Sequence, residues 1–537
     1  MSSSTSPTAL SGEEILARIH GLRHVSNSDP GSDAETRRKL NEHGIDDNEI
    51  ARQLATLRSN TAGGAGVLIN YSLLHSLQHL DVVLTRSPRL PHAAEAAVTI
   101  FRCAEIVLGC MADLAERMAA NLERENVERF VANARWRAAL HELLYRLSAL
   151  VVEVAPGPGS DSDGWLDIRL SGTWKRYEAQ TARLQQGLKT RWPEPASDIF
   201  GAGLDRPSRF VFFNEFVNTS DERIWLSRLS RVRLAGVSAH EGEDAAGFYE
   251  RIIGAEDIAA MLAALETHEE TDLLPFRVVH QVSEVIANTV HQHLSDVVES
   301  VLDAGIPLAD AARVFEVANR LLAGVDDSIK MMLRALTPAA YSAVRPNLGM
   351  VQGTSSVVLR KVLFNTVYPM LVRAYRLRLC AGAAESADDD AVVEAEARER
   401  LLGSGEVQRQ EAAILRSLVV LYQHVRTWRD NHLQLPKTHL GISPPQAPPT
   451  VSLSGSDGAV GIAHQLRRVH GADPITPLYR AALGTEPPPV HPMMAEGGFD
   501  QYMATQTATA VFDVYGVVQK RFDERKRRLA GKPAGRG

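Results

Sequence analysis

The sequence predicts a mainly α-helical protein, and two features of the chain carry that prediction. Long stretches place apolar residues at spacings of three and four, the pattern of helices that bury one face. These stretches are rich in Ala, Leu, Arg and Glu, whereas runs that alternate apolar and polar residues are scarce. The expected helices cover 66–82, 92–122, 126–155, 271–302, 307–336, 356–380 and 408–435.

The composition argues against several classes of protein. The chain has 537 residues, of which 45% are apolar and 23% charged, an ordinary globular composition. Its net charge of −7 argues against a nucleic-acid partner or an anionic membrane, because both usually require a basic face. No secretory signal and no long apolar run occurs, so we expect no membrane span. The three cysteines form no paired motif, which favours a cytoplasmic protein.

The length predicts more than one domain, and we expect four segments. They are a partly disordered tail with short helices at 1–60, a helical domain at 61–204, a second helical domain at 205–490 with the chemistry described below, and a C-terminal helix with a basic tail at 491–537.

A weak internal repeat relates the two central segments. The helix expected at 92–122 can be laid over the helix expected at 271–302 by matching Glu105 to Glu284. On that register Phe101 takes the position that His280 has in the second copy. We therefore interpret 61–204 as a degenerate duplicate, and 205–490 as the part that works.

The expected helix at 408–435 has a histidine on its buried face. Its apolar stripe runs through Leu418, Tyr422, Val425 and Trp428, and the next member of the stripe is His432. Such a histidine either hydrogen-bonds within the core or binds a metal or haem, since neutral imidazole suits iron. The chain has no HExxH, paired CxxC, GxSxG or phosphate-binding glycine motif that would point to other chemistry.

Two further elements carry polar residues at the border of a helix. Phe276 and His280 lie one turn apart at the edge of an apolar stripe, where a helix would border a pocket. Thr337 is a good helix cap, and the helix that follows places Tyr341 and Arg345 on one face. An arginine at a helix end is well placed to bind a carboxylate with two hydrogen bonds. The alternatives are a half-exposed histidine without a role and an arginine that packs on the surface.

Together these elements resemble the motifs of the tryptophan 2,3-dioxygenase superfamily, in the same order along the chain. The family's Phe-x-x-x-His-Gln helix is matched by Phe276, His280, Gln281 and a following Glu284. Its Thr-Pro segment is matched by Thr337, Pro338, Tyr341, Arg345, Gly353, Ser356 and Arg360. Its Trp-Arg-x-x-His helix end is matched by Trp428, Arg429 and His432. A looser match to its glycine-rich loop puts Ser456 where the family has Thr, after a longer and more proline-rich loop.

The resemblance covers roughly 205–490 and implies a haem-dependent dioxygenase with haem b as cofactor. It implies that His432 is the proximal iron ligand, flanked by Trp428 and Arg429, and that His280 is the catalytic residue on the distal side. The substrate-binding residues it implies are Phe276, Tyr341, Arg345 and Ser456. The substrates would be O2 and L-tryptophan or a related indole amino acid, with opening of the pyrrole ring to an N-formylkynurenine-type product.

Three alternatives stay open at this point. The same residues suit a haem-dependent monooxygenase or hydroxylase of tyrosine- or tryptophan-derived substrates in natural-product biosynthesis. The chain could also be a non-catalytic haem-binding scaffold, or a helical adaptor without haem. Family members are commonly tetramers in which one chain covers its neighbour's pocket. A fused duplicate could supply that cover, so we expect a homo-oligomer and favour a dimer.

Overall fold

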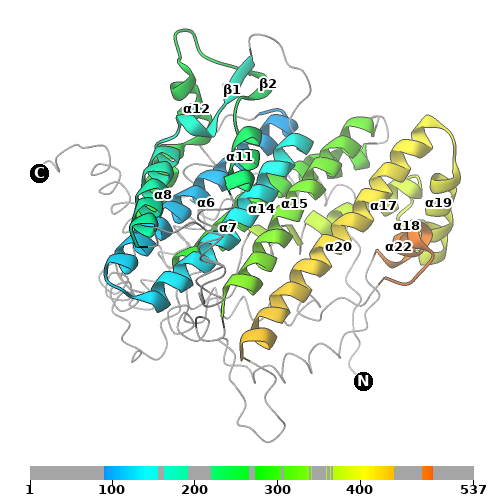
Figure 1. The fold of residues 1–537 in the computed structure, drawn as a ribbon. Coiled ribbons are helices and arrows are strands. Elements are labelled where there is room, and N and C mark those ends of the chain that lie inside the picture. Colours follow the sequence, from blue (N-terminus) through cyan, green and yellow to red (C-terminus); the bar gives the residue numbers. More distant parts are fainter. Residues whose placement is uncertain are drawn as a thin grey trace, which may run out of the picture.

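The structure is a computed structural model, and it confirms the expected mainly helical fold. It describes residues 90–154, 163–191, 219–264, 273–303, 308–337, 340, 358–359, 363–364, 367–440 and 475–487. Within these ranges the long helices lie side by side along one diagonal (Figure 1). They are α6 (His92–Glu123), α7 (Val127–Val154), α8 (Gly172–Arg191), α14 (Leu273–Leu302), α15 (Ala309–Ala335) and α20 (Glu406–Leu440).

Shorter elements cover the ends and one side of the long helices. They are β1 (Asp163–Leu166), the 3-10 turn η1 (Ile168–Leu170), α11 (Thr219–Arg228), β2 (Val232–Ser238), α12 (Ala245–Ile253), α13 (Ala255–Ala264), α17 (Tyr368–Leu379), α18 (Ala384–Asp388), α19 (Asp390–Leu402) and α22 (Thr476–Leu483). The expected helices at 92–122, 126–155, 271–302 and 307–336 match α6, α7, α14 and α15 closely. The expected helix at 66–82 lies outside the described residues.

Helices α6 and α14 form the centre of the core and run antiparallel. Both are buried on nearly all sides, which is why their sequences are apolar around most of the helix. Three polar pairs link them, and each step forward along α6 is a step back along α14. The pairs are His92–Asp296 (2.9 Å), Glu95–His293 (3.2 Å) and Thr99–Thr289 (2.6 Å).

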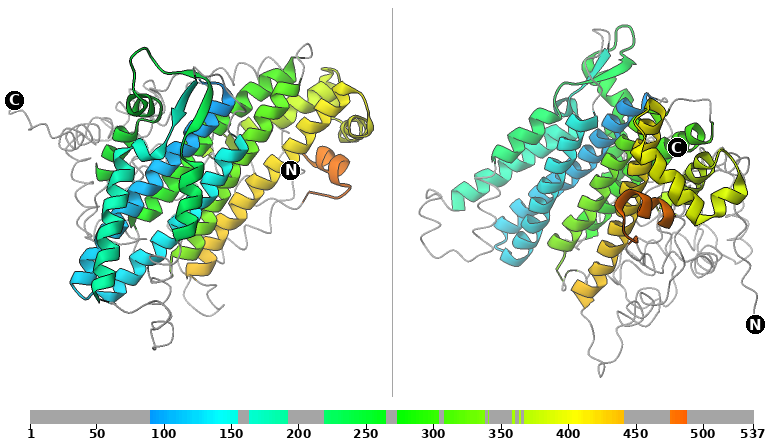
Figure 2. Two further views of the ribbon diagram at one scale, coloured as in Figure 1. Left: turned by 45° about the horizontal axis from the view of Figure 1, so that its top comes forward. Right: turned by 90° about the vertical axis from the view of Figure 1, so that its right-hand side faces the viewer.

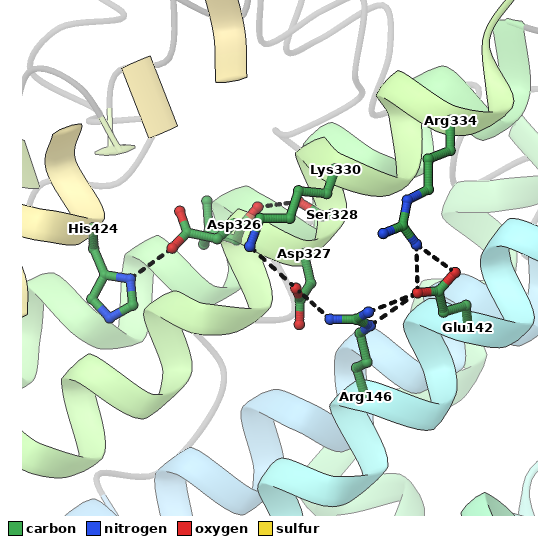
Figure 3. Close-up of polar contacts among 9 residues, drawn as sticks. Glu142, Arg146, Asp326, Asp327, Ser328, Lys330, Arg334 and His424 are labelled. Carbon is green, nitrogen blue, oxygen red and sulfur yellow. Dashed lines mark hydrogen bonds and ion pairs between the residues drawn. The ribbon is translucent and has the colours of Figure 1, made fainter. Parts of the chain in front are cut away.

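Helices α7 and α15 follow α6 and α14 in the chain and also run antiparallel to each other. Arg146 binds Asp327 at 3.0 Å, and Glu142 binds Arg334 at 2.7 Å (Figure 3). These ion pairs are largely exposed, so each contributes about 1 kcal/mol or less. Their value here is that they fix the register of the two helices.

Helix α20 lies beside α15 and runs parallel to it. Asn319 donates to the backbone oxygen of Ser417 at 2.9 Å. Seven residues further along both helices, His424 Nδ1 donates to Asp326 Oδ2 at 2.7 Å. The same spacing on both helices shows that their register is constant over this length.

A two-stranded antiparallel sheet, which the sequence reading did not find, lies beyond one end of the long helices (Figure 2). Its strands β1 and β2 come from opposite sides of the division expected at 204/205, and Trp165 pairs with Arg233. Helix α12 follows the sheet. Asp244 caps it by accepting from Gly247 N at 2.7 Å, and Gly254 ends it with a φ of 71°, which favours glycine.

Candidate functional site

His280 is buried in the N-terminal half of α14, with 7% of its surface exposed. Its Nδ1 lies 2.8 Å from the backbone oxygen of Phe276 and must donate, since a carbonyl oxygen only accepts. Burial lowers the pKa of His280 to about 4, and the bond to Phe276 offsets only part of this effect. At neutral pH the ring is therefore uncharged, with Nε2 as its acceptor nitrogen. The Phe276 and His280 rings lie 4.6 Å apart.

The register of α14 against α15 gives the level of His280 in the bundle. Ser283 Oγ lies 2.9 Å from Ser328 Oγ, between antiparallel helices. His280 lies three residues before Ser283 in α14, and Met331 lies three residues after Ser328 in α15. Because the helices are antiparallel, His280 is level with Met331. The candidate residues on α14 therefore lie near the C-terminal end of α15.

The register of α15 against α20 gives the level of His432. The contact of Asp326 with His424 fixes the two parallel helices. Eight residues further along both, position 432 is level with Arg334. His280 and His432 therefore belong to two helices that flank α15, within about one helical turn of the same level along it.

Thr337 leaves α15 at this same end of the bundle. Its Oγ1 accepts a hydrogen bond from the backbone N–H of Ala340 at 3.1 Å, as expected of a helix cap. The segment expected to hold Tyr341 and Arg345 therefore starts beside the C-terminal end of α15. Tyr341, Arg345 and Ser456 themselves lie outside the described residues.

Apolar and aromatic side chains surround this end of α20. Trp428 is buried and packs edge-to-face against Phe364, with ring centroids 5.3 Å apart. Arg429 and His432 follow on α20, which the structure continues as a helix to Leu440. Their side chains lie outside what the structure describes, so the part played by His432 stays a prediction.

We tested whether the described residues fit a haem. A haem needs apolar walls and one protein ligand, and its distal side is tuned by polar groups. The buried surfaces of Phe276, Met331, Phe364 and Trp428 are apolar, and His280 adds a neutral imidazole. These residues fit such a group. Within the described ranges no three His, Cys, Asp or Glu side chains are grouped to hold a metal ion, a criterion that a singly ligated haem iron does not need to meet.

Comparisons with protein-family models, with curated proteins and with solved structures found no match. The candidate site therefore depends on the motifs and on the geometry given above. None of the described helices combines the length and the apolar character that crossing a membrane requires.

Sequence reasoning missed two buried polar pairs. The first is Asp326 with His424, in which burial raises the pKa of Asp326 although the imidazole lowers it in part. The second is Glu105 with Tyr249, whose hydroxyl donates to Glu105 Oε1 at 2.6 Å. The partners lie 98 and 144 residues apart in the chain, so no local pattern relates them. Of these four residues, the sequence analysis singled out only Glu105, because it aligns with Glu284.

Proposed function

We propose that the protein is a haem-dependent oxygenase of L-tryptophan or a related indole amino acid. The observation that carries the proposal is the neutral, buried imidazole of His280, on α14, near the level of position 432 on α20. A distal acceptor and a proximal ligand for one haem would have to lie near a common level of the bundle. The buried apolar side chains of Phe276 beside His280, and of Phe364 and Trp428 on the α20 side, support the same interpretation.

His280 would bind the ring nitrogen of the substrate. Because Nδ1 donates to Phe276, His280 is held in the tautomer whose Nε2 is an acceptor, the form that suits an indole N–H. The low pKa of His280 keeps this acceptor unprotonated throughout the physiological range. A cationic imidazole would instead present a second donor to the indole N–H, so burial of His280 favours a ring that carries a donor.

The other residues would orient the substrate. Phe276 would contact the ring, with Tyr341 as a second wall, while Arg345 would bind the carboxylate and Ser456 the ammonium group. Bound ferrous haem would supply the activation of O2, and the chain would supply position and exclusion of water. The buried surroundings of His280 favour that exclusion, because the imidazole has little exposure to solvent.

The test is an absorption spectrum of haem-reconstituted protein, with tryptophan titrated into the ferric form. We expect a Soret band that His432→Ala loses or strongly alters and that tryptophan shifts. His424→Gln is the matched control on the same helix, since His424 is paired with Asp326, and its Soret band should remain. A wild-type protein without a Soret band would refute the proposal.

Turnover separates catalysis from haem binding. We expect His280→Gln to keep the Soret band and to lower kcat/KM for tryptophan about 10²-fold or more, the usual contribution of a positioned acid or base. His291→Gln is the matched control. His291 is also buried in α14 and also bonds the carbonyl four residues before it, Ala287, yet lies eleven residues away. Equal losses in the two variants would remove His280 from the mechanism.

A further inference from the structure

The two helical hairpins of the core are related by an approximate two-fold axis. Glu105 and Glu284 define the offset of the repeat, 284 − 105 = 179. In the antiparallel packing of α6 and α14, Ala104 lies level with Glu284. Glu105, the residue equivalent to Glu284 in the repeat, is therefore only one position away from that level. In the antiparallel packing of α7 and α15, Leu147 lies level with Asp326, and these two residues are separated by the same offset of 179. One offset therefore describes both pairs of helices.

This relation makes one face of α6 equivalent to the candidate face of α14. His280, Gln281 and Glu284 on α14 correspond to a set of three on α6, namely Phe101, Arg102 and Glu105. All six residues are buried. The carboxyl is retained in both copies, and the residue one turn before it is an imidazole in one copy and a phenyl ring in the other.

The α6 face is filled by helix α12. Arg102 donates to the backbone oxygens of Ile252 and Ile253, at 3.0 and 3.2 Å, and so binds the C-terminal end of this helix. Tyr249 of α12 lies against Phe101, with ring centroids 6.1 Å apart in an edge-to-face arrangement. Its hydroxyl donates to Glu105. The occupant of this face is thus an aromatic ring with a donor directed at the carboxyl.

The surroundings of Glu105 are those of a built site. Glu105, Phe101 and Tyr249 are each at most 1% exposed. Burial raises the pKa of Glu105, and the hydrogen bond from Tyr249 and the nearby hydroxyls of Thr173 and Ser171 lower it in part. Glu105 offers Tyr249 an acceptor oxygen whether or not it carries a proton.

We propose that the face of α6 formed by Phe101, Arg102 and Glu105 is a second aromatic-ligand site, which the chain fills with its own Tyr249. Its ligand class is a phenol, a ring whose O–H reaches Glu105. The proposal stands on the fold and on the Tyr249 contacts, and it needs no haem.

The test removes the occupant and supplies it again as a small molecule. Tyr249→Ala leaves a cavity of phenol size beside Glu105, and apolar cavities of this kind bind small aromatic molecules. We expect phenol to raise the melting temperature of Tyr249→Ala and to bind about tenfold or more tightly than anisole, which lacks the donor and cannot replace the hydrogen bond that Tyr249 makes to Glu105 Oε1. Wild type should show no such preference, because Tyr249 fills the site.

Two variants control for cavity binding in general. Tyr249→Ala/Glu105→Leu keeps the cavity and removes the acceptor, so its preference for phenol should disappear. Phe248→Ala opens a cavity in the same helix, where the ring packs over Gly164 and beside Arg251, and should bind phenol and anisole alike. Equal binding of the two ligands by Tyr249→Ala, or no binding, would overturn the proposal.

Loss of a buried ring can prevent folding. If Tyr249→Ala is insoluble, the same comparison is made on refolding yield after dilution from denaturant into phenol, anisole or buffer alone. Recovery that phenol alone improves supports the site. Equal recovery in all three, or recovery in none, overturns it.

Discussion

Mild acid should destabilise the fold through buried histidines, and His291 of α14 gives the clearest case. It is 1% exposed, and burial lowers its pKa from 6.5 to about 4. Between these two pKa values, His291 is therefore protonated in the unfolded chain and neutral in the folded chain. The stabilisation from keeping His291 neutral is complete at neutral pH and is lost as the pH falls below the unfolded value.

The magnitude follows from the two pKa values of His291. Between about pH 7.5 and pH 5, a group with a pKa of 6.5 unfolded and about 4 folded removes about 2 kcal/mol from the free energy of unfolding. His280 has a folded pKa of about 4 for the same reason and should remove a similar amount. Burial raises the pKa of Glu105, Asp113 and Asp326, so protonation of these carboxyls on acidification acts in the opposite direction.

The assay therefore compares a variant with the wild type. The carboxyls contribute equally to the pH dependence of both proteins, so their contribution cancels in the difference. Urea unfolding of wild type and His291→Gln is followed by circular dichroism at both pH values. We expect the loss on acidification to be about 2 kcal/mol smaller in His291→Gln. A His291→Gln variant with the full wild-type loss would refute the reasoning.

Substitutions test three local contacts. Thr337→Ala removes the capping oxygen that accepts from Ala340 N, just after α15, and should lower the free energy of unfolding by about 1 kcal/mol, measured in urea. Asp326→Ala leaves the half-buried His424 without its acceptor and should cost about 1–3 kcal/mol, and a double-mutant cycle with His424→Ala should show coupling between the two. Gly324→Ala should cost less than Gly324→Leu, because its Cβ would meet only the side-chain ends of Ile286, Leu147 and Leu150, at 2.9, 3.3 and 3.6 Å, whereas Gly324→Leu should cost about 1–3 kcal/mol by overpacking.

The long helices could be predicted from sequence because each carries enough turns of apolar spacing to outweigh local exceptions. The helix expected at 271–302 is α14 at Leu273–Leu302, although it holds many polar residues. The sheet could not be predicted in the same way. β1 has four residues, β2 is interrupted by Gly236 at a φ of 77°, and their pairing is irregular. Too few residues alternate for a pattern to emerge.

The candidate site was predictable as a set of residue types and not as an arrangement. Spacing put Phe276 and His280 on one face, and the structure adds the proton on Nδ1 and the burial that keeps the ring neutral. Those depend on α15 and on the backbone of α14, which no local pattern encodes. The register of α15 and α20, which brings position 432 near the level of His280, depends on Asp326 and on residues 98 further along the chain.

The two faces of the repeat show why periodicity alone cannot assign function. Phe101 on α6 and His280 on α14 have equivalent positions and are both buried. What differs is the chain between the hairpins, which folds α12 against α6 and binds it there through Arg102. An arginine directed at helix-end carbonyls, and a carboxyl directed at Tyr249, are residues suited to holding a segment of the same protein. The candidate face on α14 carries Gln281 in place of that arginine, and Gln281 donates to Met261 Sδ of α13 at 3.9 Å. This helical position therefore contacts a helix of the protein's own chain in each half, and in our proposal it is the neighbouring His280 that meets an aromatic substrate.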